Sequence, residues 1–354
     1  MNGTWMIYGA NGYTGELIAR TAVEQGLKPI LGGRNKEKIH TLASELGLES
    51  RLFSLNEPTN VQDGLSGIDL VLHCAGPFSV TSAPMIEACI EVGVHYLDLT
   101  GEIGVFEHAH APEQSKRAKE AGVVICSGVG FDVIPTDCIA LKLKELLPNA
   151  THLSLGFDSD SGISPGTYKT MLQGLSSGSA ERRNGIITEF PIGTKVRFID
   201  FGRGSRSAMA IPWGDVSTAF YTTGIPNITT WIPMPTYKII GARSLKWLKP
   251  ILAKPMLQKL LRNWVDKSIT GPDEEARKNS PAYIWGEATN STGEKRTVRI
   301  QTANVYSLTV FGALAIVTRL LETEDLLGGS YTPATLFGSE LIEQLSGSGN
   351  FQIE

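Results

Sequence analysis

The sequence predicts an α/β protein in which an N-terminal doubly wound parallel sheet is followed by a second, mixed α+β domain. From the start to about residue 130, short β-rich runs alternate with amphipathic helical runs, as in a parallel sheet covered on both faces. Beyond Leu147 the composition changes to Gly-, Ser- and Thr-rich segments, and runs such as 195–201 and 297–302 alternate apolar and polar residues. The length of 354 residues and the hydrophobic content of 42% suit two domains with full cores.

Six strands are expected in the first domain, with helices between them. The strand-like runs are residues 5–8, 28–31, 51–55, 70–74, 96–99 and 123–126. Two more helices, 305–322 and 335–345, are expected near the C-terminus. The apolar run 300–318 contains Gln, Asn, Ser and Thr, so we expect a core helix there and no membrane span. In doubly wound folds ligands gather at the carboxyl ends of the strands, so the residues after each strand form the candidate site.

A glycine-rich turn follows the first predicted strand and opens a helix. It reads Gly9-Ala10-Asn11-Gly12-Tyr13-Thr14-Gly15. The glycines permit a tight turn and let backbone N–H groups reach a pyrophosphate, whose charge the helix N-terminus favours. A glycine pattern alone is weak evidence, but its place between a strand and an amphipathic helix is what a Rossmann-type dinucleotide site requires.

The end of the second predicted strand favours NADP over NAD. An NAD site normally carries an acid there for the ribose hydroxyls, whereas an Arg accommodates a 2′-phosphate. This chain has Arg34 and Asn35, followed by Lys38, and no acid before Glu37. We therefore assign Arg34, Asn35 and Lys38 to an NADP site, with Arg34 offering its planar fork of donors to the phosphate.

Small residues follow the fourth predicted strand, in the run Cys74-Ala75-Gly76-Pro77-Phe78. They let the backbone approach the nicotinamide ribose, and Phe78 can pack against the nicotinamide ring. Cys74 has no activating neighbour, because His73 should point to the opposite face of the strand. We expect Cys74 to be structural and not nucleophilic.

The combination of motifs resembles the saccharopine dehydrogenase-like oxidoreductases, and their trans-acting enoyl reductase branch most of all. Besides the runs above, the resemblance rests on residues 96–102, 130–137, 271–274, 285–288, 306–309 and 331–334. It implies an NADP-binding Rossmann domain over 1–130 and a substrate and dimerisation domain over 131–300. The remaining residues, 301–354, are expected to form helices that pack back on the body. Substrate identity transfers less readily, since one fold hosts many chemistries.

The proton donor is harder to assign from the residues. No Tyr is followed four residues later by Lys, so the acid pair of short-chain dehydrogenases is absent. The loops after the fifth and sixth strands offer several groups, each of which also has a structural interpretation, such as an N-cap or turn. These groups are Tyr96, Asp98, Glu102, Asp132 and Asp137. Of them, Asp132 is taken as a catalytic candidate.

An enoyl substrate would accept hydride at its β-carbon, leaving an enolate whose oxygen needs a hydrogen-bond donor. Tyr168 and Lys169 are the candidate donors, on a Gly-rich segment of the second domain. His108 and His110 diverge on a predicted helix and are poor co-ligands, so no metal is expected.

Three functions remain open at this point. The first is NADP-dependent reduction of an unsaturated, lipid-like acyl group, favoured by apolar residues of the second domain such as Trp231, Ile232, Met234, Trp247 and Trp264. The second is an imine or amino-acid dehydrogenase of saccharopine type. The third is a non-catalytic NADP-binding protein at lipid or protein surfaces.

Composition adds expectations about partners and location. Four cysteines without paired spacing, and no signal-peptide pattern, indicate the cytoplasm, and a net charge of −4 argues against nucleic acid. Residues 238–267 nevertheless carry eight basic side chains and one acid, with apolar residues at helical spacing. This basic segment fits a peripheral membrane surface or an acyl carrier protein, and equally an ordinary helix packed on its own domain.

Overall fold

The computed structural model describes residues 3–161, 178–244, 275, 280–323 and 326–354. It divides into two compact units, which we describe separately. Unit 1 comprises Met1–Ile134 with Tyr306–Leu336, and unit 2 comprises Pro135–Val305 with Phe337–Glu354.

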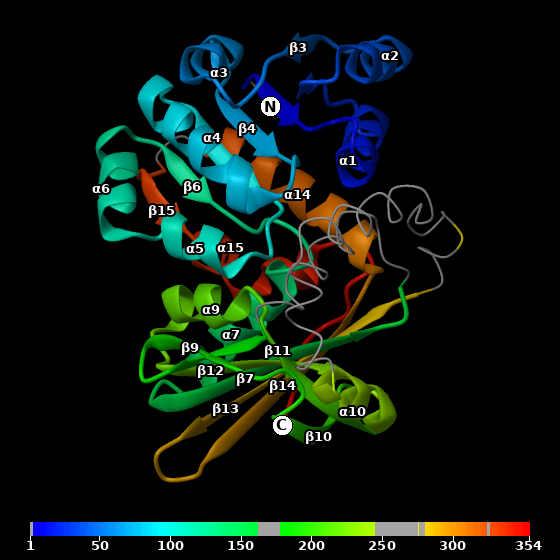
Figure 1. Ribbon diagram of the computed structural model, residues 1–354, viewed down its shortest axis with the longest axis vertical. Coiled ribbons are helices and arrows are strands. Elements are labelled where there is room, and N and C mark those ends of the chain that lie inside the picture. Colours follow the sequence, from blue (N-terminus) through cyan, green and yellow to red (C-terminus); the bar gives the residue numbers. More distant parts are fainter. Residues whose placement is uncertain (1–2, 162–177, 245–274, 276–279, 324–325) are drawn as a thin grey trace. The chain divides into compact units, whose positions relative to one another are not determined.

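The described part of unit 1 contains a seven-stranded sheet of order β15-β6-β5-β4-β1-β2-β3 (Figure 1). Every neighbouring pair is parallel, as predicted for a doubly wound fold. The strands are β1 (Trp5–Tyr8), β2 (Ile30–Gly33), β3 (Ser50–Leu52), β4 (Leu70–His73), β5 (His95–Asp98), β6 (Val124–Cys126) and β15 (Gly329–Tyr331). The strand order reverses between β1 and β4, so the loops that follow these two strands meet at the switch point where such folds bind ligands.

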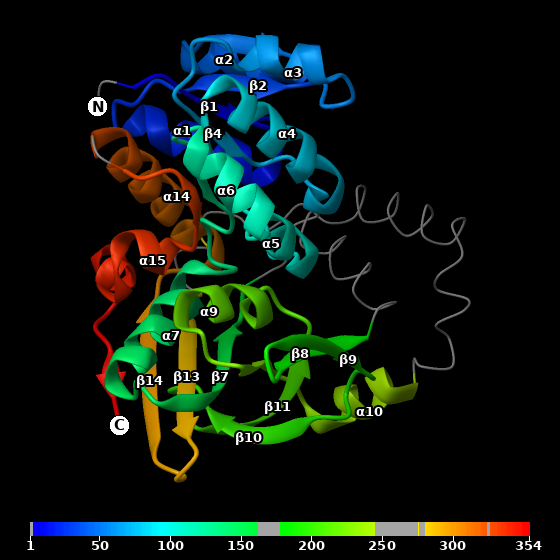
Figure 2. The same cartoon turned by 90° about the vertical axis from the view of Figure 1, so that its left-hand side faces the viewer.

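The helices of unit 1 connect and cover these strands. They are α1 (Tyr13–Glu24), α2 (Lys36–Leu46), α3 (Pro58–Leu65), α4 (Phe78–Val92), α5 (Ile103–Ala109), α6 (Pro112–Glu120), α14 (Val305–Glu322) and α15 (Pro333–Phe337). Helix α14 lies beside α1 (Figure 2). There the Tyr306 ring meets the Tyr13 ring edge-on at 5.2 Å between centroids. The N-terminal loop of the sheet is thus packed against a helix from the far end of the chain.

Strands β1 and β4 are buried along their whole length, as expected of central strands covered on both faces. One core cluster joins Met6, Val71 and Tyr96 of the sheet to Met85 and Cys89 of α4. The apolar spacing of α4 therefore serves the core of unit 1.

Several predicted elements differ from the observed ones, and β3, for example, ends at Leu52 instead of residue 55. Strand β2 begins two residues later than the predicted run 28–31 and ends at Gly33, which brings Arg34 directly to its carboxyl end. The predicted helix 335–345 is divided into α15 and a 3-10 helix, Ser339–Gln344, because Gly338 lies between them at a φ of +83°. Strand β15 was not expected, since its three residues are too few to show an alternating pattern.

Helix α14 is the one helix of the described residues that is long and apolar enough to cross a bilayer, with a mean hydropathy of 1.5. Its buried side chains include Leu308, Leu314 and Ile316. Those side chains pack inside the protein, as expected of a core helix.

Unit 2 is built on a mixed sheet, in which strands of the described residues follow the order β10-β11-β12-β7-β13-β14-β16, with β8 paired to β12 and β9 paired to β8. The strands are β7 (Ala150–Ser159), β8 (Ser179–Arg183), β9 (Ile186–Phe190), β10 (Val196–Asp200), β11 (Ser205–Ile211), β12 (Asn227–Pro233), β13 (Ala282–Asn290), β14 (Lys295–Thr302) and β16 (Gln352–Ile353). The helices are α7 (Ile134–Leu146), α9 (Asp215–Thr223) and α10 (Thr236–Ser244). This is the predicted mixed α+β domain.

Candidate functional site

The three glycines of the first turn have different surroundings. Gly9 has a φ of +87°, and a Cβ there would lie 2.8 Å from the backbone nitrogen of Ala75. A Cβ on Gly15 would lie 2.5 Å from the carbonyl oxygen of Gly9. A Cβ on Gly12 would meet only that oxygen, at 3.3 Å. Glycine is therefore needed at positions 9 and 15 because a Cβ there would collide with the backbone of the protein. Gly12 is exposed, and its missing side chain leaves room for a ligand to approach the turn.

The start of α1 suits an anion. Gly12 is its N-cap, and no side chain caps the first backbone N–H groups. The nearby Glu16 carboxylate is held by Arg20 at 2.8 Å. A pyrophosphate is the acceptor that such a helix start takes in dinucleotide folds.

The other side chains of the turn contact neighbouring elements. Asn11 Oδ1 lies 3.3 Å from where a Cβ on Gly33 would be, so it closes the gap between the first turn and β2. Tyr13 packs on Tyr306, and Thr14 is partly buried at the start of α1. These positions link the glycine turn to β2 and α14.

A basic cluster stands at the carboxyl end of β2. Arg34, Asn35 and Lys38 are exposed, and Asn35 caps α2 by accepting a 3.1 Å hydrogen bond from the Lys38 backbone N–H. Burial raises the pKa of Tyr8, at the end of β1, to about 12, and the Arg34 charge opposes that rise. Arg34 therefore lies close enough to the switch point to affect Tyr8. The cluster fits a 2′-phosphate, while the Asn35 side chain already serves its own helix.

The loop after β4 is closely held. The Glu102 carboxylate accepts hydrogen bonds from the backbone N–H groups of Phe78 and Ser79, each at 2.9 Å. Unlike α1, helix α4 thus begins with its amides already paired to an acid, so the start of α1 suits an anion better than the start of α4. Burial, with a smaller contribution from the Asp98 charge, raises the pKa of the Cys74 thiol far above its usual range. Cys74 has the character of a structural thiol.

Asp98 ties the loops after β5 and β6 together. Its buried carboxylate accepts hydrogen bonds from the Tyr96 hydroxyl at 2.7 Å, Thr100 N–H at 3.0 Å and Gly128 N–H at 2.8 Å. Burial raises its pKa to about 6, and these bonds oppose the rise. The turn predicted at Thr100 is present, and the role of Asp98 is structural.

Asp132 lies at the same edge of the sheet, after β6. A Cβ on Gly101 would be 2.9 Å from its Oδ2 atom, so it touches the loop after β5. Burial raises the pKa of Asp132 to about 7. A carboxyl group that exchanges its proton near neutral pH is suited to general acid chemistry. Asp137, by contrast, accepts a hydrogen bond from Thr222 inside unit 2.

Several predicted residues lie outside the described residues. They are Tyr168, Lys169, residues 271–274 and, apart from Lys238 and Arg243, the basic side chains of residues 238–267. Of the apolar residues taken to favour an acyl-type substrate, Trp231, Ile232 and Met234 pack in two core clusters of unit 2. Trp247 and Trp264 lie outside the described residues. In the described ranges no three His, Cys, Asp or Glu side chains gather in a metal-binding group.

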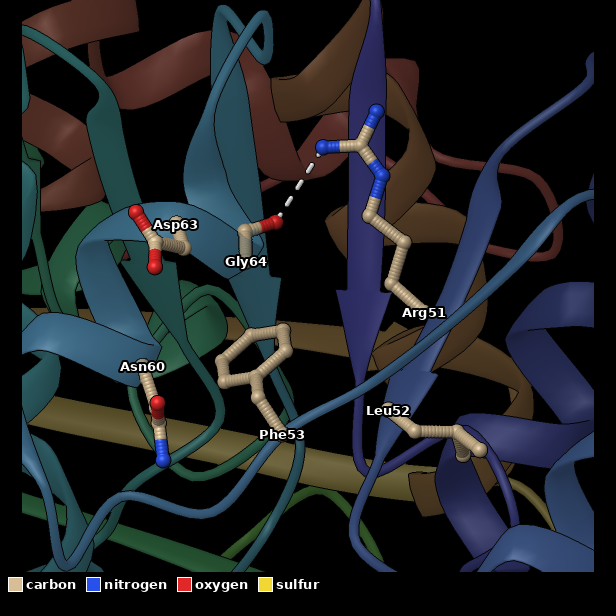
Figure 3. A pocket seen from close by; sticks show the side chains of 6 residues that line it. All are labelled: Arg51, Leu52, Phe53, Asn60, Asp63 and Gly64. Atoms are coloured by element: carbon tan, nitrogen blue, oxygen red, sulfur yellow. Dashed lines mark hydrogen bonds between the residues drawn. The ribbon is translucent and has the colours of Figure 1, made fainter.

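A hollow of about 380 Å³ lies beside β3 (Figure 3). It is lined by Arg51, Leu52, Phe53, Asn60, Asp63 and Gly64. Arg51 Nη1 donates to the carbonyl oxygens of Gly64 at 3.2 Å and Ser66 at 2.6 Å. This guanidinium therefore caps the end of α3 and is engaged within the chain.

A second hollow, of about 400 Å³, lies in unit 2 between the ends of β7, β8 and β12. Its lining includes the buried Glu181, whose carboxylate is paired with Arg183 at 2.7 Å and with Lys195. Thr229 also donates to Glu181, at 3.3 Å. These polar walls do not suit an apolar acyl chain.

Comparison with known proteins identifies the N-terminal part. Residues 5–126 match the family described as the saccharopine dehydrogenase NADP-binding domain. A rat saccharopine dehydrogenase-like oxidoreductase is 29% identical over 50% of this chain and 47% of its own length. The N-terminal part of the chain is therefore similar to the saccharopine dehydrogenase-like oxidoreductases. Its cofactor is NADP, as the Arg34 cluster predicts.

Two further relatives extend the likeness. A trans-acting enoyl reductase of Mycobacterium bovis is 24% identical over 97% of this chain and 96% of its own. A lipid droplet localized protein of Caenorhabditis elegans is 25% identical over 52% of this chain and 47% of its own. The aligned part of this chain spans about half the length of the rat and nematode relatives.

The fold is similar to that of a solved structure. Apo saccharopine dehydrogenase (L-Glu forming) of Saccharomyces cerevisiae covers 100% of both chains with a TM-score of 0.68 and 10% sequence identity. At that identity the likeness concerns the fold alone.

Proposed function

We propose that this protein is an NADPH-dependent reductase of the C=C bond in an unsaturated, lipid-like acyl substrate. The observation that carries the proposal is the alignment with the mycobacterial trans-acting enoyl reductase, which runs through both units of the chain. The name of the nematode relative, a lipid droplet localized protein, supports a lipid-like substrate.

The residues of unit 1 fit the cofactor at each of its parts. The uncapped start of α1 and the open Gly12 suit the pyrophosphate, and Arg34 with Lys38 suits the 2′-phosphate. The small residues Ala75 and Gly76 leave room for the nicotinamide ribose, and Phe78 stands at the start of α4 beside them. When bound, NADPH supplies a hydride.

In the proposed reaction the β-carbon of the substrate accepts that hydride. The π-electron pair of the C=C bond moves to the carbonyl side as an enolate, and the α-carbon then takes a proton. Asp132 is the proposed source of this proton, because its pKa of about 7 leaves it protonated in a large fraction of molecules at neutral pH. Tyr168 and Lys169 are kept as proposed donors to the enolate oxygen.

The test is a substrate panel with NADPH deuterated at C4 of the nicotinamide ring. Enoyl thioesters should oxidise the cofactor, and deuterium should appear at the β-carbon of the saturated product. Turnover of cyclic imines with deuterium on the carbon next to nitrogen would replace the proposal by an imine dehydrogenase. NADPH binding without turnover of enoyl thioesters, imines or aldehydes would favour a non-catalytic NADP-binding protein.

For partners and location, we propose that residues 238–267 bind an acyl carrier protein that presents the substrate. Eight basic side chains in this segment complement an acidic carrier. An anionic membrane surface is the other outcome of the same test, and a homodimer through unit 2 stays a proposal from the family resemblance.

A further inference from the structure

His73 is a buried imidazole at the carboxyl end of β4, immediately before the loop that we assign to the nicotinamide ribose. Three aromatic rings surround it, with centroids 5.6 Å away for Tyr8, 5.5 Å for Phe78 and 6.1 Å for Tyr96. Burial lowers the pKa of His73 to about 3, so the ring is neutral at physiological pH. A neutral imidazole has one N–H donor and one bare nitrogen, and the neighbours decide which is which.

The neighbour that decides is Thr81, on the first turns of α4. Its hydroxyl donates to the carbonyl oxygen of Ala75 at 2.6 Å and shares that proton with the carbonyl of Pro77 at 3.1 Å. His73 Nε2 lies 3.0 Å from the same hydroxyl oxygen. Because carbonyl oxygens only accept and the hydroxyl has one proton, Nε2 must be the donor to Thr81. The bare Nδ1 is buried and has no hydrogen-bond partner in the described part of the chain.

The result is a directed chain of hydrogen bonds from His73 through Thr81 to Ala75 and Pro77. Ala75 is also held on its other side, because its backbone nitrogen lies 2.8 Å from where a Cβ on Gly9 would be. The loop after β4 is thus fixed between the glycine turn and the His73–Thr81 pair. Neither His73 nor Thr81 needs to touch a ligand to set the position of this loop.

We propose that His73 and Thr81 are positioning residues for the nicotinamide end of the NADP site, acting through the carbonyl groups of Ala75 and Pro77. The inference rests on the proposed placement of the nicotinamide ribose at this loop. It predicts that losing the pair weakens binding of whole NADPH but not of its adenine end, which binds at the glycine turn and Arg34.

The experiment compares NADPH with adenosine 2′,5′-bisphosphate, which lacks the nicotinamide half, by calorimetric titration of the full chain. In Thr81→Val, NADPH affinity should fall about five- to tenfold, as expected for one lost intramolecular hydrogen bond. Affinity for the bisphosphate should stay unchanged, and Thr81→Ser, which keeps the hydroxyl, should bind NADPH like the unmodified protein. Thr194→Val is the matched control, because its hydroxyl donates to the Pro191 carbonyl in unit 2 at 2.7 Å.

Variants of His73 test the hydrogen bond that His73 donates to Thr81. His73→Gln retains an N–H donor at the reach of Nε2 and should keep NADPH affinity, whereas His73→Leu should reproduce the Thr81→Val defect. These variants keep the test decisive if Thr81→Val does not fold.

Equal weakening of both ligands, or unchanged NADPH binding in both Thr81→Val and His73→Leu, overturns the positioning role. Failure of Thr81→Ser to restore binding overturns it as well. If the unmodified protein bound NADPH no more tightly than the bisphosphate, the placement of the nicotinamide ribose at this loop would be wrong, and the inference with it. If it bound NADPH normally but reduced no enoyl substrate, only the proposed function would fail.

Discussion

The Glu102 carboxylate accepts a 2.9 Å hydrogen bond from the backbone N–H of Phe78. Through this bond the loop after β5 supplies the cap that α4 lacks, since its own N-cap residue, Pro77, has no side-chain acceptor. The loop predicted to contact the cofactor is therefore anchored by an acid from a neighbouring loop.

Glu102→Ala should destabilise the protein by about 1 kcal/mol, the usual cost of losing a helix N-cap. Urea unfolding followed by circular dichroism measures the change. Glu120→Ala is the control, because that exposed side chain makes only a 3.9 Å surface pair with Lys116. Equal stability of the two variants would show that the cap contributes nothing.

Two glycine substitutions should separate folding from cofactor binding. Gly12→Val should abolish NADPH binding and leave the fold intact, because its side chain would occupy the open approach to the turn. Gly15→Ala should lower the melting temperature, since its Cβ would lie 2.5 Å from the Gly9 carbonyl oxygen. Thermal unfolding and NADPH titration on both variants check this. Normal NADPH binding by Gly12→Val would show that the turn does not contact the cofactor.

Arg34→Ala should lower NADPH affinity by about 1.5–3 kcal/mol, the range for hydrogen bonds to charged groups, and leave NADH affinity unchanged. Titration with both cofactors measures the difference. Arg117→Ala serves as the matched control, because Arg117 pairs with Glu87 on the surface at 2.8 Å. Unchanged NADPH affinity in Arg34→Ala would remove this residue from the 2′-phosphate site.

Asp132 should make stability and activity depend on pH in a definite direction. Its pKa is raised to about 7, above the value near 3.9 of an unfolded chain, so the folded state binds the extra proton between these values. Its contribution to stability is complete below about pH 4 and is lost as the pH rises towards 7. Asp132→Asn should therefore gain stability relative to the unmodified protein above pH 7, and the gain should vanish near pH 4.

The same residue should limit the rate as a general acid. The kcat of enoyl reduction should fall as the pH rises through about 7, and Asp132→Asn should lose most activity across the range. A pH–rate profile with no inflection near 7 would exclude Asp132 as the proton donor.

The basic segment can be tested with salt and charge reversal. Binding to an acyl carrier protein should weaken as salt rises, because exposed charges are screened within about 10 Å at 0.1 M ionic strength. Reversing Lys246, Lys249, Lys259 and Arg262 to Glu should remove that binding and leave NADPH affinity intact. Binding to anionic vesicles in place of the carrier would redirect the proposal to a membrane surface, and insensitivity to both changes would leave the segment a packing element.

Sequence patterns were sufficient for the parallel sheet and its first turn. Strand β1 and helix α14 begin and end where predicted, since a continuous apolar run defines the strand and a long apolar run defines the helix. Strand β15 could not be predicted from its own residues, because only pairing with β6, two hundred positions earlier, makes it a strand. The Glu102 cap and the His73–Thr81 bond escaped prediction for a similar reason. They join residues whose spacing follows no helical or strand period, so only the folded loops bring them together.

The pairing of Gly329–Tyr331 with Val124–Cys126 also determines when the sheet of unit 1 can finish folding during synthesis. During synthesis the first six strands leave the ribosome long before β15, so the outer edge of β6 stays open while most of unit 2 is being translated. An unpaired strand edge is a template for intermolecular association. Nascent or truncated chains that stop before residue 329 should therefore depend on chaperones, and the sheet of unit 1 can be completed only after β15 has been translated.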